Sequence, residues 1–335
     1  MHQNNNGWTP LHVACWRGVY DSVVAHLLRL NVEAAWALDS RGRLPLHSAC
    51  MYADTVPVGT IRQLLLHMMV DGTRNGIEMS VLRRDRCGDT AITLLSYAYR
   101  RALEEWRREN TELDESMKVS MLNYYDKMSL LVTAACLGTV EPSDDVKAGF
   151  SLVHGAITVP ETIDSAFFEL ALKMPDNGTK WQENDSNGRL LLHIAAGRQV
   201  PYDLDTMRYS RFDRAFRVAN EAEVINLLVD KHRSSTQVRD PSGLFPFDLA
   251  VNSGKKLNEG VRSILIANPS ALEARSIDIR FYPCILESLA CHESSLDGTF
   301  ELLRSKPNLV IGINGDQKKS SGFIKRMMFS ISGCK

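Results

Sequence analysis

One nine-residue segment recurs along this chain, and the recurrence restricts the fold more than any other feature. Gly7-Trp8-Thr9-Pro10-Leu11-His12-Val13-Ala14-Cys15 returns 35 residues later as Gly42-Arg43-Leu44-Pro45-Leu46-His47-Ser48-Ala49-Cys50. Fainter copies begin at Gly88 and Gly149, clearer ones begin at Gly188 and Gly243, and a degraded copy lies near Phe281. A period of about 20 to 50 residues is typical of repeat architectures, in which each unit packs only on its neighbours.

Each copy carries the signals of a turn followed by two helices. An acidic or amide residue stands three positions before the glycine, at Asn4, Asp39, Asp85, Asp185 and Asp240. This D-x-x-G pattern favours a turn because the Asp side chain bonds to nearby backbone and glycine accepts a positive φ. A proline suited to a first helical turn and a second apolar stripe follow in the clearest copies. Such a unit cannot bury its apolar face alone, so the sequence predicts a stack.

The segment Thr9-Pro10-Leu11-His12-Val13-Ala14 carries the T-P-L-H-x-A signature, and Pro45-Leu46-His47-Ser48-Ala49 carries all of it but the Thr. On these residues the chain resembles the ankyrin repeat family over about residues 4–312. The family's usual G-A-D-V-N is replaced by Asn31-Val32-Glu33-Ala34-Ala35, which indicates a divergent subfamily. The resemblance implies an all-α solenoid of stacked helix-turn-helix units joined by hairpin loops, with six to seven repeats and helical insertions.

The expected domain organisation is one array over residues 4–312 and a basic, disordered tail over residues 313–335. Repeats are expected to start near residues 4, 39, 85, 146, 185, 240 and 277. Apolar residues keep helical spacing through about 90–138, which predicts an extended helical arm of two lengthened helices that projects beyond the stack. An ordinary solvated insertion also explains the segment and is the favoured interpretation, and both stay open.

A second insertion at about 198–218 alternates aromatic residues with arginines. Its members are Tyr202, Tyr209, Phe212 and Phe216 with Arg208, Arg211, Arg214 and Arg217. This mixture occurs in protein-binding hot spots and on nucleic-acid stacking surfaces. A protein-contact loop and a partly helical cover over the repeat are the two main interpretations.

Composition bounds the class of protein. The 335 residues carry a net charge of −1, which gives no general attraction to nucleic acid or anionic membranes. No apolar run reaches the ~20 residues that span a bilayer, and the first residues do not form a signal peptide. Seven cysteines without a CxxC pair favour reduced thiols. We therefore expect an intracellular protein, cytoplasmic or nuclear. No polar cap precedes residue 4, so residues upstream of this chain are also expected.

Catalytic and metal-binding motifs are not found in the sequence. His12, His47, His154 and His193 occupy equivalent repeat positions, which lie roughly 8–10 Å apart in adjacent units, whereas zinc needs ligands at ~2.0–2.3 Å. No phosphate-binding loop, dinucleotide fingerprint, HExxH or nucleophile elbow occurs. The sequence therefore predicts a non-enzyme with no cofactor, no metal, no nucleic-acid partner and no small-molecule substrate. The resemblance implies that these histidines bond within and between turns.

The resemblance further implies that a partner binds the concave face, through hairpin tips and exposed first-helix positions. The candidate residues are Asn6, Trp8, Trp16, Arg17, Arg41, Arg43, Met51, Tyr52, Arg86, Asp89, Tyr97, Asn187, Arg189 and Arg198. The aromatic residues and arginines among them fit another protein with an acidic, extended or helical segment. In the other interpretation, Trp8 and Trp16 only cap the open end of the stack.

The function expected from these observations is that of a protein–protein interaction scaffold or adaptor. The alternative is a regulatory or anchoring subunit. In that case the helical arm or the basic C-terminal tail would tether the protein to a larger assembly or a membrane surface.

Overall fold

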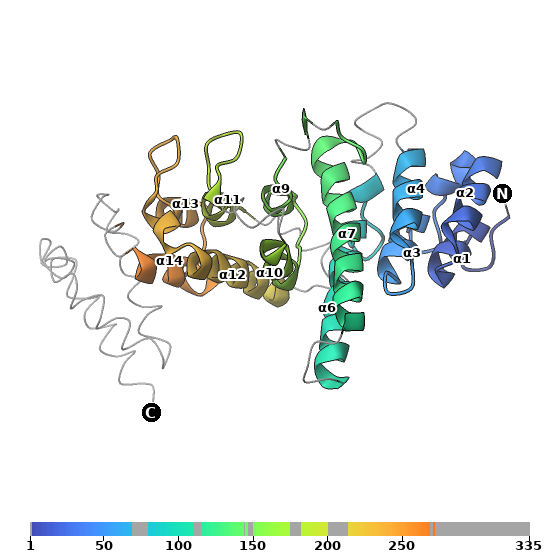
Figure 1. Ribbon diagram of the computed structural model, residues 1–335, viewed down its shortest axis with the longest axis horizontal. Helices are drawn as coiled ribbons and strands as arrows, with labels where there is room; N and C mark the ends of the chain where they lie inside the picture. The colour runs from blue at the N-terminus through green and yellow to red at the C-terminus, as the bar shows by residue number, and fades with distance from the viewer. Residues whose placement is uncertain are drawn as a thin grey trace, which may run out of the picture.

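The protein is an elongated stack of helices in the computed structural model (Figure 1). The structure describes residues 2–68, 80–109, 115–143, 145–146, 150–174, 182–199, 214–268 and 271. Within these residues there are twelve α-helices, three 3₁₀ helices and no strand. The repeat expected near residue 277, residues 200–213 of the second insertion and the tail at 313–335 lie outside the described residues.

The helices occur in pairs along the chain. The α-helices are α1 (Pro10–Arg17), α2 (Asp21–Leu30), α3 (Pro45–Met51), α4 (Val58–Met68), α6 (Ala91–Glu109), α7 (Glu115–Leu137), α9 (Leu152–Thr158), α10 (Ser165–Lys173), α11 (Leu191–Gly197), α12 (Arg214–Lys231), α13 (Pro246–Asn252) and α14 (Val261–Ala267). The 3₁₀ helices are η1 (Val32–Trp36), η5 (Arg233–Gln237) and η6 (Leu257–Glu259). The last five residues of the insertion expected at 198–218 therefore belong to α12.

Local sequence explains where the first helix begins and ends. The Thr9 hydroxyl accepts a hydrogen bond from the backbone N–H of His12 at 3.3 Å, which satisfies one of the unpaired donors of the first turn. Pro10 occupies the first helical position, where no N–H is needed. Gly18 stops the helix in the left-handed region, with φ at 63°.

The D-x-x-G segments form one and the same turn. In the second copy, the Asp39 carboxylate oxygen Oδ1 accepts from the backbone N–H groups of Arg41 and Arg43, at 2.8 and 2.9 Å. The Asp39 N–H donates to the Arg43 carbonyl, and Gly42 has φ at 74°. The same bonds recur at Asn4, Asp85, Asp185 and Asp240. The turn prediction is thus confirmed at all five positions.

The pairs stack in two rows. The first helices α1, α3 and α6 contact one another in order, as do α9, α11 and α13. The second helices α2, α4, α7, α10, α12 and α14 form the other row. The two halves of the stack meet where α7 contacts α9 and α10. Apolar side chains such as Leu11, Leu28, Leu46 and Leu64 are buried between the rows.

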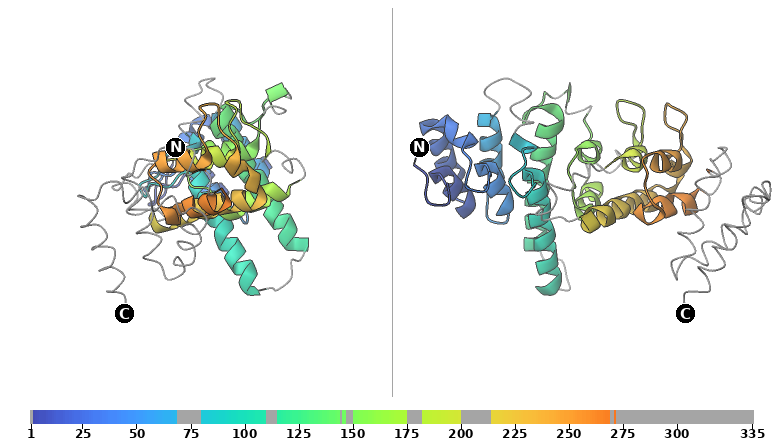
Figure 2. Two further views of the ribbon diagram at one scale, coloured as in Figure 1. Left: turned by 90° about the vertical axis from the view of Figure 1, so that its left-hand side faces the viewer. Right: turned by 180° about the vertical axis from the view of Figure 1, so that it is seen from behind.

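The third pair is longer than the others. α6 has 19 residues and α7 has 23. Each is therefore longer than a seven- or eight-residue helix, which spans ~10–12 Å. Both extend beyond the stack on one side (Figures 1 and 2). The Tyr124 ring of α7 lies 5.4 Å from that of Tyr99 and 6.4 Å from that of Trp106, both on α6. These aromatic contacts hold the two helices side by side.

A 3₁₀ turn follows each of the second helices α2 and α12. In η1 the Ala34 N–H donates to the Asn31 carbonyl, and both Ala34 and Ala35 are buried. η5 follows α12 in the same way, and Asn268 donates from its side-chain amide to the Thr236 carbonyl at 2.7 Å. Small residues fill this turn because it packs directly against the next helix pair.

Candidate functional site

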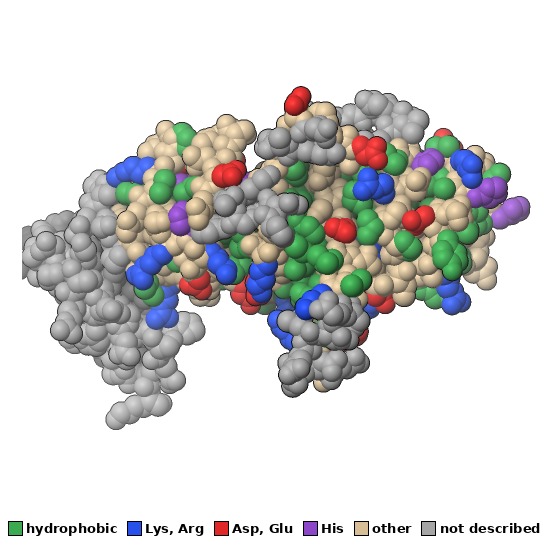
Figure 3. All heavy atoms as spheres, viewed as in Figure 1, with side chains coloured by type: hydrophobic (Ala, Val, Ile, Leu, Met, Phe, Trp, Pro, Cys, Tyr) green, Lys and Arg blue, Asp and Glu red, His purple; other side chains and the backbone are tan. Residues whose placement is uncertain are grey.

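The first three hairpins stand in register at one edge of the stack. The Ser40 N–H of the second hairpin donates to the Asn6 carbonyl of the first at 3.0 Å, and the Arg86 N–H of the third donates to the Arg41 carbonyl at 3.0 Å. Asn6, Arg41 and Arg86 are all exposed. The sequence candidates at these three tips therefore lie in one row on the surface. Charged side chains of both signs are interspersed over the face in Figure 3.

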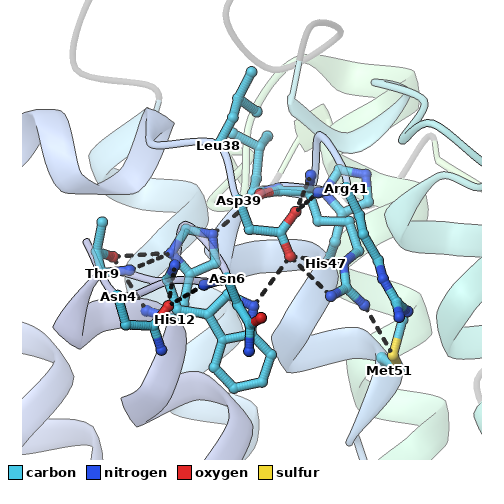
Figure 4. Close-up of polar contacts among 12 residues, drawn as sticks. Asn4, Asn6, Thr9, His12, Leu38, Asp39, Arg41, His47 and Met51 are labelled. Atoms are coloured by element: carbon cyan, nitrogen blue, oxygen red, sulfur yellow. Dashed lines mark hydrogen bonds and ion pairs between the residues drawn. The ribbon is translucent and has the colours of Figure 1, made fainter.

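Asp39 is the polar centre between the first two hairpins (Figure 4). Its Oδ2 accepts from the Trp8 indole N–H at 3.2 Å, from Arg43 Nε at 2.9 Å and from Arg43 Nη2 at 2.8 Å. The pKa of Asp39 is lowered from its ordinary value. Burial alone would raise this pKa, but the hydrogen bonds from Arg43 and its positive charge outweigh the effect of burial. The carboxylate is therefore ionised and structural rather than a free acid or base.

Three aromatic rings form a ladder behind the first two hairpins. The rings of Trp8 and Trp16 meet edge to face at 5.3 Å, and those of Trp16 and Tyr52 at 6.2 Å. The Arg17 guanidinium lies 4.3 Å from the centre of the Trp16 ring. All three rings are half-buried, so they contact the fold and keep an exposed edge. We call Trp8, Trp16 and Tyr52 the aromatic ladder.

Three residues predicted as exposed contacts are buried, and their expected exposure was wrong. Arg43 turns inward, where it pairs with Asp39 and donates from Nη1 to the Met51 sulfur at 3.4 Å. Met51 is covered by that contact and is 9% exposed. Asp89 is 1% exposed, and its backbone closes the third hairpin. Arg43 and Met51 contact each other within one repeat, and the spacing of the repeat motif does not reveal this contact.

The later candidates are divided between the surface and the interior. Tyr97 is half-buried, and Asn187 at the fifth hairpin is exposed. Arg189 pairs with Asp185 at 2.9 Å and is half-buried. Arg198, whose side chain is only 16% exposed, donates to the Glu161 carbonyl at 2.7 Å. These residues do not join the row that Asn6, Arg41 and Arg86 form.

A polar cluster at the centre of the stack was not predicted. The Glu161 carboxylate accepts from Arg84 at 2.8 Å and from the Thr93 hydroxyl at 3.1 Å. The Glu161 side chain is 2% exposed, so these partners satisfy a buried charge. Glu161 is far from Arg84 in the sequence and belongs to no repeat motif, so no local signal could have identified the pair.

One arginine of the second insertion belongs to this interior. Arg217 is 1% exposed and donates to the Thr162 hydroxyl at 3.1 Å. Phe216 lies beneath the Arg100 guanidinium of α6, with 4.4 Å between the charge and the ring centre. These two insertion residues therefore join helix pairs together and do not form a free contact loop.

Three of the four recurrent histidines link successive repeats. His12 accepts at Nδ1 from the Thr9 N–H and donates from Nε2 to the Arg43 carbonyl at 3.0 Å. His47 and His193 make the equivalent bonds to the Arg83 and Val238 carbonyls. Burial lowers the pKa of all three, to about 4 for His47. They are neutral linkers near pH 7, as the resemblance implied.

The described residues form neither a metal-binding group nor a membrane-spanning helix. No group of three or more His, Cys, Asp or Glu in this part of the chain is placed to hold a metal ion. None of the helices described here has the length and apolar character needed to cross a membrane.

Comparison with protein families finds the ankyrin repeat in residues 6–35, which contain α1, α2 and most of η1. The resemblance carried by the first signature is thereby confirmed. No curated protein matches the chain. Ankyrin repeats generally act as protein–protein interaction modules and are typically non-catalytic. The first helix pair of this protein thus matches the ankyrin repeat.

Proposed function

We propose that the protein is a divergent ankyrin-type array of six to seven repeats that acts as a non-catalytic interaction scaffold. In this proposal the partner binds along the row of hairpin tips and the adjoining first helices. The observation that carries the proposal is the alignment of the exposed Asn6, Arg41 and Arg86 tips by backbone hydrogen bonds. Rigid and aligned positions lose little conformational freedom on binding.

The chemistry of this row favours an acidic, extended partner segment. Arg41 and Arg86 present guanidinium groups at adjacent tips, and Arg17 adds a third beside Trp16. Arginine binds carboxylates through two parallel hydrogen bonds, and half-buried aromatic rings supply apolar contact area. The proposed partner is therefore another protein. The intracellular location and the adaptor role stay predictions.

Affinity capture with a matched control tests this function. Wild-type protein, a Trp16→Ala/Arg41→Ala/Arg86→Ala variant and a control Arg29→Ala/Arg62→Ala variant on the second helices would be compared by mass spectrometry. We expect a protein that the wild type and the control retain and the first variant loses. Arg43 is left unchanged, because its removal would leave the buried Asp39 carboxylate without its counter-charge. A loss of capture caused by unfolding could then not be distinguished from a loss of binding contacts.

The captured protein is then measured by calorimetry at two salt concentrations. Binding that weakens with salt in the wild type and loses most of this dependence without Arg41 and Arg86 supports the acidic-segment proposal. Identical capture by all three proteins contradicts the assignment of this row.

One observation favours a second candidate function. The helices α6 and α7 extend beyond the stack, and Val119 on α7 is 66% exposed. A projecting helical arm could anchor the protein to a larger assembly. Capture that depends on Val119 and not on Trp16 or Arg41 would favour this anchoring role.

A further inference from the structure

Positive charge at the hairpin tips is concentrated at one point of the row. Each tip consists of the two residues that follow the Asp or Asn of its turn, and in the second and third hairpins these are Ser40-Arg41 and Arg86-Cys87. The tips of the other described hairpins contain no charged residue: Asn5-Asn6, Ser186-Asn187 and Pro241-Ser242. The charge therefore belongs to a single pair, Arg41 and Arg86, and is not spread along the row.

The two arginines of this pair are adjacent in space. The Arg86 N–H donates to the Arg41 carbonyl at 3.0 Å, so the two side chains leave neighbouring points of the backbone. The side-chain stem of Arg86 also passes over the second hairpin, since a Cβ placed at Gly42 would lie 3.4 Å from Arg86 Cγ. Gly42 thus leaves room for Arg86 directly beside Arg41. Both arginines are exposed.

Neither guanidinium has a counter-charge within the described part of the chain. The two side chains take part in no ion pair or hydrogen bond there, in contrast to Arg43 and Arg189, which pair with the carboxylates of their own turns. The carboxylates of the second and third turns, Asp39 and Asp85, are buried and accept backbone N–H groups. Two adjacent like charges repel each other, and an anion bound between them would remove this repulsion.

A phosphoryl group fits this pair better than a carboxylate does. A carboxylate has one negative charge, which offsets only one of the two guanidiniums. A phosphoryl group on a serine, threonine or tyrosine carries a charge of about −1.5 to −2 and three acceptor oxygens, so it can accept hydrogen bonds from two guanidiniums at once. The uncharged tips on either side of the pair offer no further charge to bind a run of acidic residues.

We propose that Arg41 and Arg86 together bind one phosphoryl group on a side chain of the partner protein. This inference rests on the proposed function, because it names the acidic group that the row of hairpin tips binds. Binding would then depend on phosphorylation of the partner.

Side-chain NMR on the full chain tests the site, with phenyl phosphate as the probe and benzoate as its carboxylate counterpart. The arginine Nε–Hε signals are assigned with Arg41→Lys and Arg86→Lys and followed at constant ionic strength. We expect both signals to shift saturably, with a dissociation constant at least about tenfold lower for phenyl phosphate than for benzoate. The exposed Arg29 and Arg62 are the controls and should respond equally weakly to both anions. Equal responses of the pair to the two anions, or a response by only one of its arginines, would overturn the proposal.

A lysine variant tests whether the two guanidinium forks matter beyond their charge. Arg41→Lys/Arg86→Lys keeps both charges but removes the planar forks, so phenyl phosphate should bind at least about threefold more weakly than it binds the wild type. Arg29→Lys/Arg62→Lys is the matched control and should leave this binding unchanged. Equal binding by the wild type and the first variant would indicate unspecific attraction and would overturn the two-arginine site.

Phosphatase treatment separates this inference from the proposed function. The captured partner is released and offered again to the wild-type protein, with and without prior treatment with a phosphatase. Loss of binding after treatment supports the phosphoryl group as the ligand. Retention after treatment overturns this inference and leaves the proposed function intact, because the partner would still require the row of hairpin tips. Failure of the proposed function gives a different result, which is equal capture by the wild type, the row variant and the control.

Discussion

The indole N–H of Trp8 donates to the Asp39 carboxylate over 3.2 Å, from the first hairpin to the second. The same carboxylate oxygen pairs with Arg43, whose side chain is 7% exposed, while the Asp39 side chain is fully buried. Trp8 is thereby fixed against the second repeat and in contact with Trp16. This bond couples the turn, the buried ion pair and the aromatic ladder.

Removing the Asp39 carboxylate should destabilise the N-terminal repeats strongly. Asp39→Ala is expected to lower the free energy of unfolding by about 3–5 kcal/mol, because Arg43 would stay buried without a counter-charge. Urea denaturation followed by circular dichroism measures the change. Asp185→Ala is the matched control: it lies in the same turn, but its partner Arg189 has a side chain 37% exposed and can reach water. If Asp185→Ala lowered the free energy of unfolding as much as Asp39→Ala does, this account would be contradicted.

Stability should fall with pH below neutrality because of the buried histidines. Burial lowers the pKa of His47 to about 4, whereas an unfolded histidine titrates near 6.5. Between these values the unfolded chain binds a proton that folded His47 does not. The free energy of unfolding therefore decreases as pH falls from about 6.5 to about 4, by up to about 3 kcal/mol from this residue.

Urea denaturation across this pH range measures the dependence. His47→Gln should lower stability at pH 7 and flatten the slope between pH 6.5 and 4. The exposed His26→Gln is the control substitution. An unchanged slope in the His47 variant would show that other groups cause the acid sensitivity.

Adding a methyl group at the first hairpin should cost more than adding it at the sixth. Gly7 and Gly243 have similar positive φ values, 73° and 78°, so alanine is strained by roughly 1–2 kcal/mol at both. At Gly7 the new Cβ would also lie 2.7 Å from the Ser40 nitrogen, whereas at Gly243 it meets nothing within 4 Å. Gly7→Ala should therefore lower the urea midpoint more than Gly243→Ala does. Equal losses would mean that the hairpins are not in close contact.

A buried lysine should make the protein more stable in mild alkali. Lys127 on α7 is fully buried, donates to the Ala53 carbonyl, and has its pKa lowered by burial to about 8. An unfolded lysine titrates near 10.4, so the unfolded chain holds the proton more tightly between these values. The free energy of unfolding should rise as pH increases from about 8 to about 10.4. Lys127→Met should remove this rise, as urea denaturation at pH 7.5 and 10 can test. If the free energy of unfolding still rose between pH 7.5 and 10 in Lys127→Met, the assignment of this rise to Lys127 would be contradicted.

Much of the local structure could be predicted because its causes lie within a few residues. Asp39 and Gly42 close their hairpin with bonds to their own segment, and Thr9 with Pro10 starts α1. The recurrence of these residues predicted the turns, the short first helices and the second helices that follow. Neutral linking histidines followed from the resemblance and are found at His12, His47 and His193.

The candidate surface could be predicted only in part, because exposure depends on which side chains pack together in the folded chain. Asn6, Arg41 and Arg86 are exposed at hairpin tips, where no repeat covers them. Arg43 is only two residues from Arg41, yet it is buried, because Asp39 offers it a carboxylate and Met51 covers it. The repeat motif by itself does not distinguish these two arginines, because both flank Gly42.

The sequence by itself determined the repeating unit of this protein, since hydrogen bonds between residues two to four positions apart define each turn and each helix end. Tertiary structure alone decided which polar groups from distant helix pairs meet in the interior. Glu161 meets Arg84, and Lys127 meets Ala53, only when helix pairs distant in the sequence pack together.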